Sequence, residues 1–228
     1  MTLAEKLQAV AQNEQKVYDA GFAAGQAQGG GSGEEWTQYA QSFSYTFGTI
    51  TFPENYELVM TVPSMNSATN IIYGAINLKK LTLLGGDSTG IVAGSYCFMH
   101  SSIVEMDFSN FRNGGIQFGS TAKYPFYGCA RLKYIRGEID MSIVTSALNY
   151  FNGCGQLVEV RFKAGTISVD LSIPSANLST DSIQSIIDGL ADLTGQTAQT
   201  LTLANAIGNK LTDAQKATAT AKNWTLVY

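Results

Sequence analysis

The feature that most constrains this chain is a sequence pattern that begins at residue 126 and recurs at residue 151. It reads Phe-Tyr-Gly-Cys-x-x-Leu-x-x-Ile over residues 126–135 and Phe-Asn-Gly-Cys-x-x-Leu-x-x-Val over residues 151–160, with the same offset at every matched position. A fixed period of about 20–50 residues indicates an array of similar units, each of which buries its apolar side against its neighbours. The repeat therefore predicts an elongated stack.

Degenerate copies of the pattern precede these two units. We align Cys97, His100, Ile103, Met106 and Phe108 with Phe151, Cys154, Leu157, Val160 and Phe162, and Ile72, Ala75, Leu78, Leu81 and Leu83 form an earlier copy. The anchors then lie at 78, 103, 132 and 157, and the middle interval is longer than the two equal intervals beside it. The longer interval contains Asn113-Gly114-Gly115, and we expect an inserted loop there because a glycine pair turns the chain at little cost.

The repeat unit resembles the BspA-type leucine-rich repeat, whose consensus is roughly Ala-Phe-x-x-Cys-x-x-Leu-x-x-Ile. The residues that carry the resemblance are Phe126, Cys129, Leu132, Ile135, Phe151, Cys154, Leu157 and Val160. It covers residues 72–162. The chain departs from the family pattern at Cys97, His100 and Gly137, so we expect the stack to be irregular there.

The two ends of the chain carry a second resemblance. Residues 3–21 resemble the opening of tail and baseplate-associated proteins from phages of gut Firmicutes, in which BspA-type repeats often follow. Residues 211–226 are similar to the closing segment of the same proteins. This resemblance implies a phage setting and leaves the ligand open.

Together the pattern and the resemblance predict a β-rich α/β fold, a leucine-rich-repeat solenoid with a parallel strand ladder. We expect a helix over 1–28, a glycine-rich linker over 29–34, an N-terminal β cap over 35–70, BspA-type repeats over 71–175 and C-terminal strand–helix capping repeats over 176–228. A cap is needed because an open end would expose core and an unpaired strand edge.

The N-terminal segment has the pattern of a coiled-coil helix. Thr2 and Glu5 match a capping box. Apolar residues at heptad-like spacing form one seam: Leu3, Leu7, Val10 and Val17. Two interpretations stay open: an oligomerising or particle-attaching stalk, trimeric if the phage resemblance holds, or a helix packed on its own domain. The glycine-rich segment that follows, a natural hinge or a cloning remnant, favours the stalk.

The segments that flank the repeats also show periodic patterns. Alternating apolar residues between 36 and 62 predict strands, with a turn at Pro53-Glu54-Asn55. After residue 162 we expect a strand that ends near Pro174, a helix capped by Ser179 or Thr180, a strand at Leu201 and Leu203, a helix from Thr212 to about Lys222, and a last strand in which Trp224 and Leu226 are equivalent to Leu201 and Leu203.

Composition limits the partners and the location. Charged residues make up 14% of the chain, below the ~25% of an average globular protein, and the net charge is −4. Without a basic stripe we expect no nucleic-acid partner. The first apolar run is broken by charged residues, and no run approaches the ~20 apolar residues of a membrane span, so we expect neither a signal peptide nor membrane insertion. These features favour synthesis in a host cytoplasm and a place in the virion tail, with the bacterial cell surface as the alternative.

The sequence contains no recognisable catalytic or metal-binding constellation. His100 is the single histidine, and we expect its ring to point inward from a cysteine position. Ser101 and Ser102 lack a base and an acid at workable spacing. We therefore expect no catalytic residue, metal or other cofactor, and we disfavour a cell-wall hydrolase. Cys129 and Cys154 share one repeat position, either as buried thiols, which we favour, or as a disulfide.

The candidate binding residues are strand positions that face away from the core. If the strands stack in register, they form two columns: Lys80, Glu105, Tyr134 and Glu159 in the first, and Thr82, Asp107, Arg136 and Arg161 in the second. Mixed charge with an aromatic residue suits recognition of a protein or a glycan. Cross-strand charge pairing that keeps the surface soluble explains the same residues.

The leading functional hypothesis is a phage tail or tail-fibre-like structural protein. Its N-terminal helix would join other tail proteins or copies of itself, and its repeats would contact a bacterial cell-surface glycan or protein. The alternative is a bacterial BspA-type adhesin or protein-interaction scaffold, which predicts an export signal or a cell-wall anchor.

Overall fold

A computed structural model gives the structure of this chain. It describes residues 34–37, 43–44, 51–62, 68–69, 74–85, 95–112, 114–147 and 149–228. The expected helix over 1–28, with Leu3, Leu7, Val10 and Val17, and the glycines of 29–33 lie outside the described residues. The described part is an α/β fold with little helix, and each strand pairing in it is parallel. The expected fold class is confirmed at this level.

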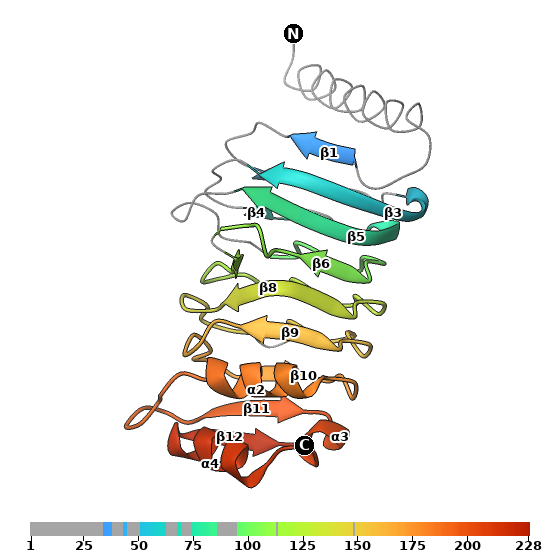
Figure 1. Cartoon of the computed structure of the whole chain (residues 1–228). Coiled ribbons are helices and arrows are strands. Elements are labelled where there is room, and N and C mark those ends of the chain that lie inside the picture. The colour runs from blue at the N-terminus through green and yellow to red at the C-terminus, as the bar shows by residue number, and fades with distance from the viewer. Residues whose placement is uncertain are drawn as a thin grey trace.

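Parallel strands follow one another along the largest sheet (Figure 1). Its members are β1 (Glu34–Thr37), β3 (Thr51–Val62), β5 (Ile76–Gly85), β6 (Glu105–Asp107), β7 (Gly115–Gln117), β8 (Tyr134–Asp140) and β9 (Glu159–Phe162). They pair in the order β1-β3-β5-β6-β8, and β7 and β9 both pair with β8. A small separate sheet pairs β2 (Phe43–Ser44) with β4 (Ala68–Thr69). Because β1 and β3 continue the largest sheet, the domain boundary expected at residue 70 falls within a continuous sheet.

The turn expected at residues 53–55 is absent, and that prediction is wrong. Strand β3 runs through this segment as one strand of 12 residues. Its register against β5 shifts between Thr51 and Tyr56, so the intervening residues bulge out of the ladder. Asn55 has φ 60°, which asparagine tolerates better than most residues. Turn-forming residues here produce a β-bulge and not a chain reversal.

The longer repeat interval accommodates an additional strand. Strand β6 pairs with residues 134–136 of β8, and β7 pairs with residues 138–140. Gly137 lies between these halves with φ 85°. A Cβ atom there would lie 2.8 Å from the carbonyl oxygen of Gly114 and 2.8 Å from the carbonyl carbon of Phe108. The irregularity expected at Gly137 is thus present, because the inserted segment approaches too closely for a side chain.

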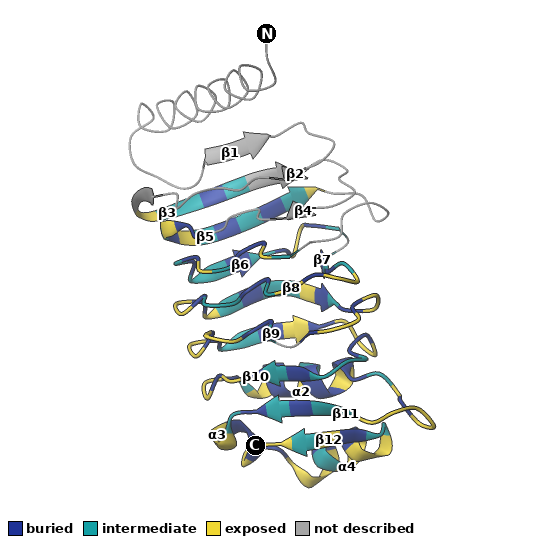
Figure 2. Ribbon diagram, turned by 180° about the vertical axis from the view of Figure 1, so that it is seen from behind, coloured by how far each residue is buried: buried dark blue, intermediate teal, exposed yellow. Residues whose placement is uncertain are grey.

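One continuous core of buried apolar residues runs along the stack (Figure 2). The repeat anchors are fully buried in it: Leu78, Ile103, Leu132 and Leu157. Three phenylalanine rings also stack there, with centroids 5.6 Å apart for Phe98 and Phe126 and 5.2 Å apart for Phe126 and Phe151. Phe98, and not Cys97, therefore takes the phenylalanine position of its unit.

The cysteine position of the same unit holds Ser101, so the alignment that placed His100 there is wrong. Ser101 is buried, and its Oγ lies 3.4 Å from Cys129 Sγ. Cys129 and Cys154 make equivalent contacts, each donating through Sγ to the carbonyl of a phenylalanine in the preceding unit, at 2.9 and 3.0 Å. The segment 98–103 is one residue shorter than its counterpart in the next unit, which displaces an alignment made from the leucine-type anchors.

The C-terminal part consists of strand–helix units, as expected. A second parallel sheet contains β10 (Leu171–Ile173), β11 (Gln199–Leu203) and β12 (Trp224–Val227), and the helices are α2 (Thr180–Gly189), α3 (Asn205–Gly208) and α4 (Asp213–Ala221). Ser179 caps α2, and Thr212 caps α4 through a capping box, which confirms both predicted helix starts. The expected spacing aligned Leu201 with Trp224, but Leu201 pairs with Leu226, so that alignment is wrong. The sequence did not predict α3.

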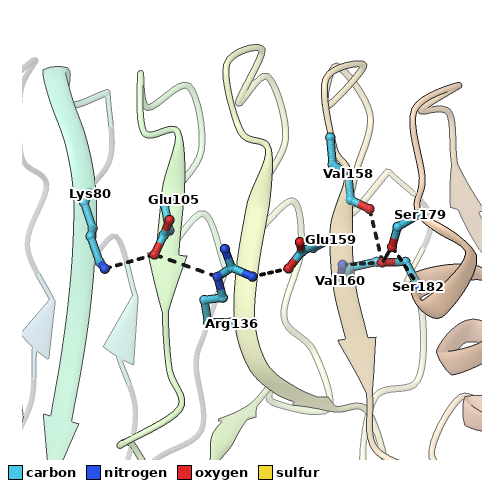
Figure 3. Close-up of polar contacts among 8 residues, drawn as sticks. All are labelled: Lys80, Glu105, Arg136, Val158, Glu159, Val160, Ser179 and Ser182. Carbon is cyan, nitrogen blue, oxygen red and sulfur yellow. Dashed lines mark hydrogen bonds and ion pairs between the residues drawn. The ribbon is translucent and has the colours of Figure 1, made fainter.

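Helix α2 lies where a strand after β9 would continue the sheet, with β10 behind it in Figure 1 and in front of it in Figure 2. Ser182 Oγ accepts the Val160 N–H at 3.0 Å, and Ser185 Oγ accepts the Phe162 N–H at 2.9 Å. Ser182 Oγ also donates to the Val158 carbonyl at 3.1 Å (Figure 3). Three residues apart on one helix face, the two hydroxyls match alternate N–H groups of β9. The helix therefore covers the edge that would otherwise accept another strand.

Candidate functional site

The outer face of the largest sheet carries four charged side chains of alternating sign, which we call the charged row: Lys80, Glu105, Arg136 and Glu159 (Figure 3). Lys80 Nζ lies 2.9 Å from Glu105 Oε1, and Arg136 Nε lies 3.8 Å from the same oxygen. Arg136 Nη1 donates to Glu159 Oε2. Because the four residues come from β5, β6, β8 and β9, the row ties four strands together.

The first predicted column is in register across the same strands. Lys80 pairs with Glu105, Glu105 with Tyr134, and Tyr134 with Glu159. Arg136 lies two residues beyond Tyr134 on β8, and its guanidinium carbon is 4.9 Å from the centroid of the tyrosine ring. An arginine from the second column thus supplies the cation that separates the two glutamates of the first.

The second predicted column is in register over only part of its length. Thr82 pairs with Asp107, and Asp107 pairs with Arg136. Arg161 pairs with Glu138, so its expected place beside Arg136 is wrong. Strand β8 contains two more residues than β9 between the flanking register pairs, because the added strand β7 distorts β8 at this point.

The charges of the charged row neutralise one another. The row has two cations and two anions, and its side chains are 24–40% exposed. Ion pairs at this exposure contribute about 0.2–1 kcal/mol each. The hydrogen bond with Glu105 raises the pKa of Lys80 against the opposing effect of burial. Cross-strand pairing, which the sequence left open, therefore describes the geometry, and a partner would meet a preformed surface without net charge.

A second surface cluster was missed by the sequence reasoning. It lies on the turns that precede β6 and β8, and we call it the aromatic ledge: Tyr96, His100, Tyr124 and Tyr127. The rings of Tyr96 and Tyr124 stack with centroids 5.6 Å apart and planes 14° apart. Tyr127 meets Tyr124 and His100 edge to face, each at 5.5 Å. His100 is exposed, so the expectation that its ring points inward is wrong.

The aromatic ledge is built on a turn that recurs in three successive units. The first residues of the turns are Tyr96, Tyr124 and Asn149, the fourth are Met99, Tyr127 and Asn152, and the fifth are His100, Gly128 and Gly153. In each turn the N–H of the fourth residue donates to the carbonyl of the first at 3.3–3.4 Å. The first and fifth residues all have positive φ, between 54° and 85°. The turn therefore demands two left-handed residues in every unit.

Three members of the ledge occupy left-handed positions that glycine or asparagine takes at lower cost. Tyr96, Tyr124 and His100 have φ values of 61°, 54° and 56°. Such a conformation costs a residue with a large side chain about 1–2 kcal/mol. Each ring contact contributes about 0.5–1.5 kcal/mol in return. The two terms are of similar size, so folding stability alone does not account for aromatic residues at these positions.

The neighbouring unit presents amides where the ledge presents rings. Asn149 and Asn152 occupy the turn positions of Tyr124 and Tyr127, and Asn152 Nδ2 lies 3.4 Å from Asn149 Oδ1. Gly128 leaves room for the histidine ring, because a Cβ there would lie 2.2 Å from His100 Nδ1. A histidine aligned with glycines at 128 and 153 is the sequence signal that could have located the ledge.

The buried cysteines are chemically quiet. Cys97, Cys129 and Cys154 are thiols outside any disulfide and have no exposed surface, which agrees with the buried-thiol interpretation. Burial raises the pKa of Cys129 to about 11, against hydrogen bonds from Ser101 that lower it. Burial likewise raises the pKa of Cys154. The thiolate is the nucleophilic form, so neither Cys129 nor Cys154 acts as a nucleophile near neutral pH.

Two further observations concern metals and membranes. Within the described ranges, no three His, Cys, Asp or Glu side chains gather closely enough to hold a metal ion. In the same part of the chain, no helix combines the length and the apolar character of a bilayer span. A scan against protein-family models, a search of curated proteins and a search of solved structures found no match to this chain.

Proposed function

We propose that this chain is a BspA-type leucine-rich-repeat solenoid of a phage tail or tail fibre, and that its sheet face recognises a bacterial surface receptor. The observation that carries the proposal is the in-register column Lys80, Glu105, Tyr134 and Glu159, which repeats one surface position across four parallel strands. The stacked phenylalanines and the continuous core support the solenoid class. The phage setting is supported by the resemblance of residues 3–21 and 211–226.

The geometry of the face suits recognition by preorganisation. Ion pairs hold Arg136 between two glutamates, and its guanidinium covers one side of the Tyr134 ring. A partner would therefore meet side chains that are already ordered, and less conformational entropy is lost on binding. Tyrosine and arginine are also enriched among the residues that dominate binding energy. Trimerisation through residues 1–28 would present three copies of the face and raise avidity.

A cell-binding assay with a matched control tests the role of the sheet face. The face variant combines Tyr134→Ala, Arg136→Ala and Arg161→Ala. The control variant combines Lys210→Ala, Lys216→Ala and Tyr228→Ala, which also removes two cations and a tyrosine. In the control, Lys216 Nζ lies 5.9 Å from the Tyr228 ring, so it loses the same kind of cation–π pair. We expect fluorescent full-length protein to bind a subset of a panel of intact gut Firmicutes cells. The face variant should bind at least about tenfold more weakly, as for loss of binding anchors.

Equal cell binding by both variants, with circular dichroism showing both folded, would rule out the sheet face as the receptor site. Immunogold labelling separates the phage proposal from the adhesin alternative. We expect antibody against residues 34–228 to label the tails of phage particles. Labelling confined to the bacterial surface would contradict the virion location.

A further inference from the structure

We propose that the aromatic ledge is a binding site for a neutral carbohydrate, distinct from the sheet face. A sugar ring would pack its C–H face on the tyrosine rings, and its hydroxyl groups would exchange hydrogen bonds with Asn149 and Asn152. This site lies on the turns before the strands, so it does not depend on the charged row.

The shape of the ledge offers flat aromatic surface to a ligand. Tyr96 is 37% exposed and lies at one end of the ring series, stacked nearly parallel to Tyr124. Tyr127 and His100 hold the series in place through edge-to-face contacts. Rings that are already ordered lose little freedom when a ligand packs on them.

The polar groups beside the rings select for hydroxyls over charge. Asn149 and Asn152 are neutral amides, each with donors and an acceptor. Apart from His100, Lys123 is the single charged residue within segments 95–100, 123–128 and 149–153. A nucleic-acid strand also stacks on aromatic rings, but it needs a positively charged groove for its backbone. A neutral sugar, with an apolar ring face and a rim of hydroxyls, fits both features.

The backbone supplies an independent reason to look for a ligand here. The turn tolerates asparagine at its first position in one unit and glycine at its fifth position in two units. The ledge nevertheless places Tyr96, Tyr124 and His100 at these positions. Strain retained beside exposed rings is the pattern expected where side chains serve binding and not folding.

The same geometry supplies a variant that keeps the fold intact. Tyr96→Asn with Tyr124→Asn places at both positions the residue that the third turn already has, so the double variant should be at least as stable as the natural chain. Tyr124→Phe keeps the ring and removes only the hydroxyl. Tyr228→Asn removes an exposed tyrosine, 44% accessible, at the far end of the molecule and serves as the matched control.

Saturation-transfer NMR on the full chain tests the proposal. The probes are a soluble rhamnose-rich bacterial cell-wall polysaccharide, a glucan and a galactan. We expect at least one to show saturation of its ring C–H protons. Affinity should fall at least about tenfold in the double asparagine variant and change less than about threefold in Tyr124→Phe and Tyr228→Asn.

Three outcomes would overturn the proposal: no signal from any of the probes, equal affinity in the double asparagine variant, or equal loss in Tyr228→Asn. The result is separable from the role of the sheet face. If the double asparagine variant binds cells and sugars normally while the face variant fails to bind cells, the ledge proposal fails alone. If the face variant binds cells normally while the ledge binds sugar, the sheet-face proposal fails alone.

Discussion

At the residue scale, the backbone decides which side chains the repeat accepts. The position that holds a buried cysteine in two units holds Ser101 in another, and all three are small enough for the core. Gly137 is required by the approach of neighbouring backbone and by its φ of 85°. The left-handed turn positions are less strict, because Tyr96 and His100 occupy them at the surface. Strain is therefore accommodated where a side chain can extend into solvent.

The thiol of Cys129 predicts a pH dependence of stability. Its pKa is about 11 in the folded chain, against 9.0 for an ordinary thiol. The folded state therefore keeps a proton that the unfolded state releases, so this contribution is complete below pH 9 and is lost as the pH rises towards 11. A pKa difference of this size corresponds to about 2–3 kcal/mol. In urea titrations at several pH values, Cys129→Ala should lose less stability between pH 9 and 11 than the natural chain. Identical slopes would contradict this assignment.

At the element scale, the main sheet changes character in two places. Strand β8 pairs with β6 over one half and with β7 over the other, which shifts the register against β9. Helix α2 then ends the sheet by supplying serine hydroxyls to β9. The charged row ends at the same strand, because no described strand follows β9 on that side. The extent of the candidate face is therefore set by α2.

Removal of the Ser182 hydroxyl should weaken this junction. Ser182→Ala leaves the Val160 N–H without its partner beneath the helix, whereas the Val158 carbonyl keeps the N–H of Ser179. An unsatisfied buried polar group costs about 1–3 kcal/mol, so we expect a loss of that size in the free energy of unfolding.

The matched control for this substitution is Ser146→Ala, at an exposed serine between β8 and β9. It removes the same hydroxyl from the surface and should change stability by less than about 0.5 kcal/mol. Equal effects of the two substitutions in chemical denaturation would show that the Ser182 hydroxyl does not support the sheet edge.

At the scale of the whole molecule, successive units contact mainly their neighbours along one axis (Figure 1). Such a stack has two ends, and each end needs its own cover. At the C-terminal end α4 packs beside β12, and Trp224 Nε1 donates to the Ala191 carbonyl at 2.9 Å. Two separated surfaces, the charged row and the aromatic ledge, lie on different segments of the same units, so one stack can contact two ligands.

The oligomeric state belongs to this scale. We expect the full chain to be a trimer, because the seam of Leu3, Leu7, Val10 and Val17 has coiled-coil spacing. Residues 34–228 alone should then be a monomer. Light scattering coupled to size-exclusion chromatography measures both masses. A full-length chain with the mass of a monomer would contradict the stalk interpretation.

Sequence by itself determined the elements whose signals are local. The repeat period identified the buried anchors, the capping residues Ser179 and Thr212 located the C-terminal helices, and equivalent strand positions identified the first column. These features follow from apolar spacing and cap chemistry within a few residues of chain.

Tertiary structure decided what depends on register between distant segments. The bulge in β3, the two halves of β8, the partner of Arg161 and the exposed ring of His100 all depend on how many residues face each neighbouring unit. One residue fewer in segment 98–103 moves a side chain from core to surface without changing the local pattern. The aromatic ledge was hidden for the same reason: its rings come from separate turns, and only the stacking of the units brings them together.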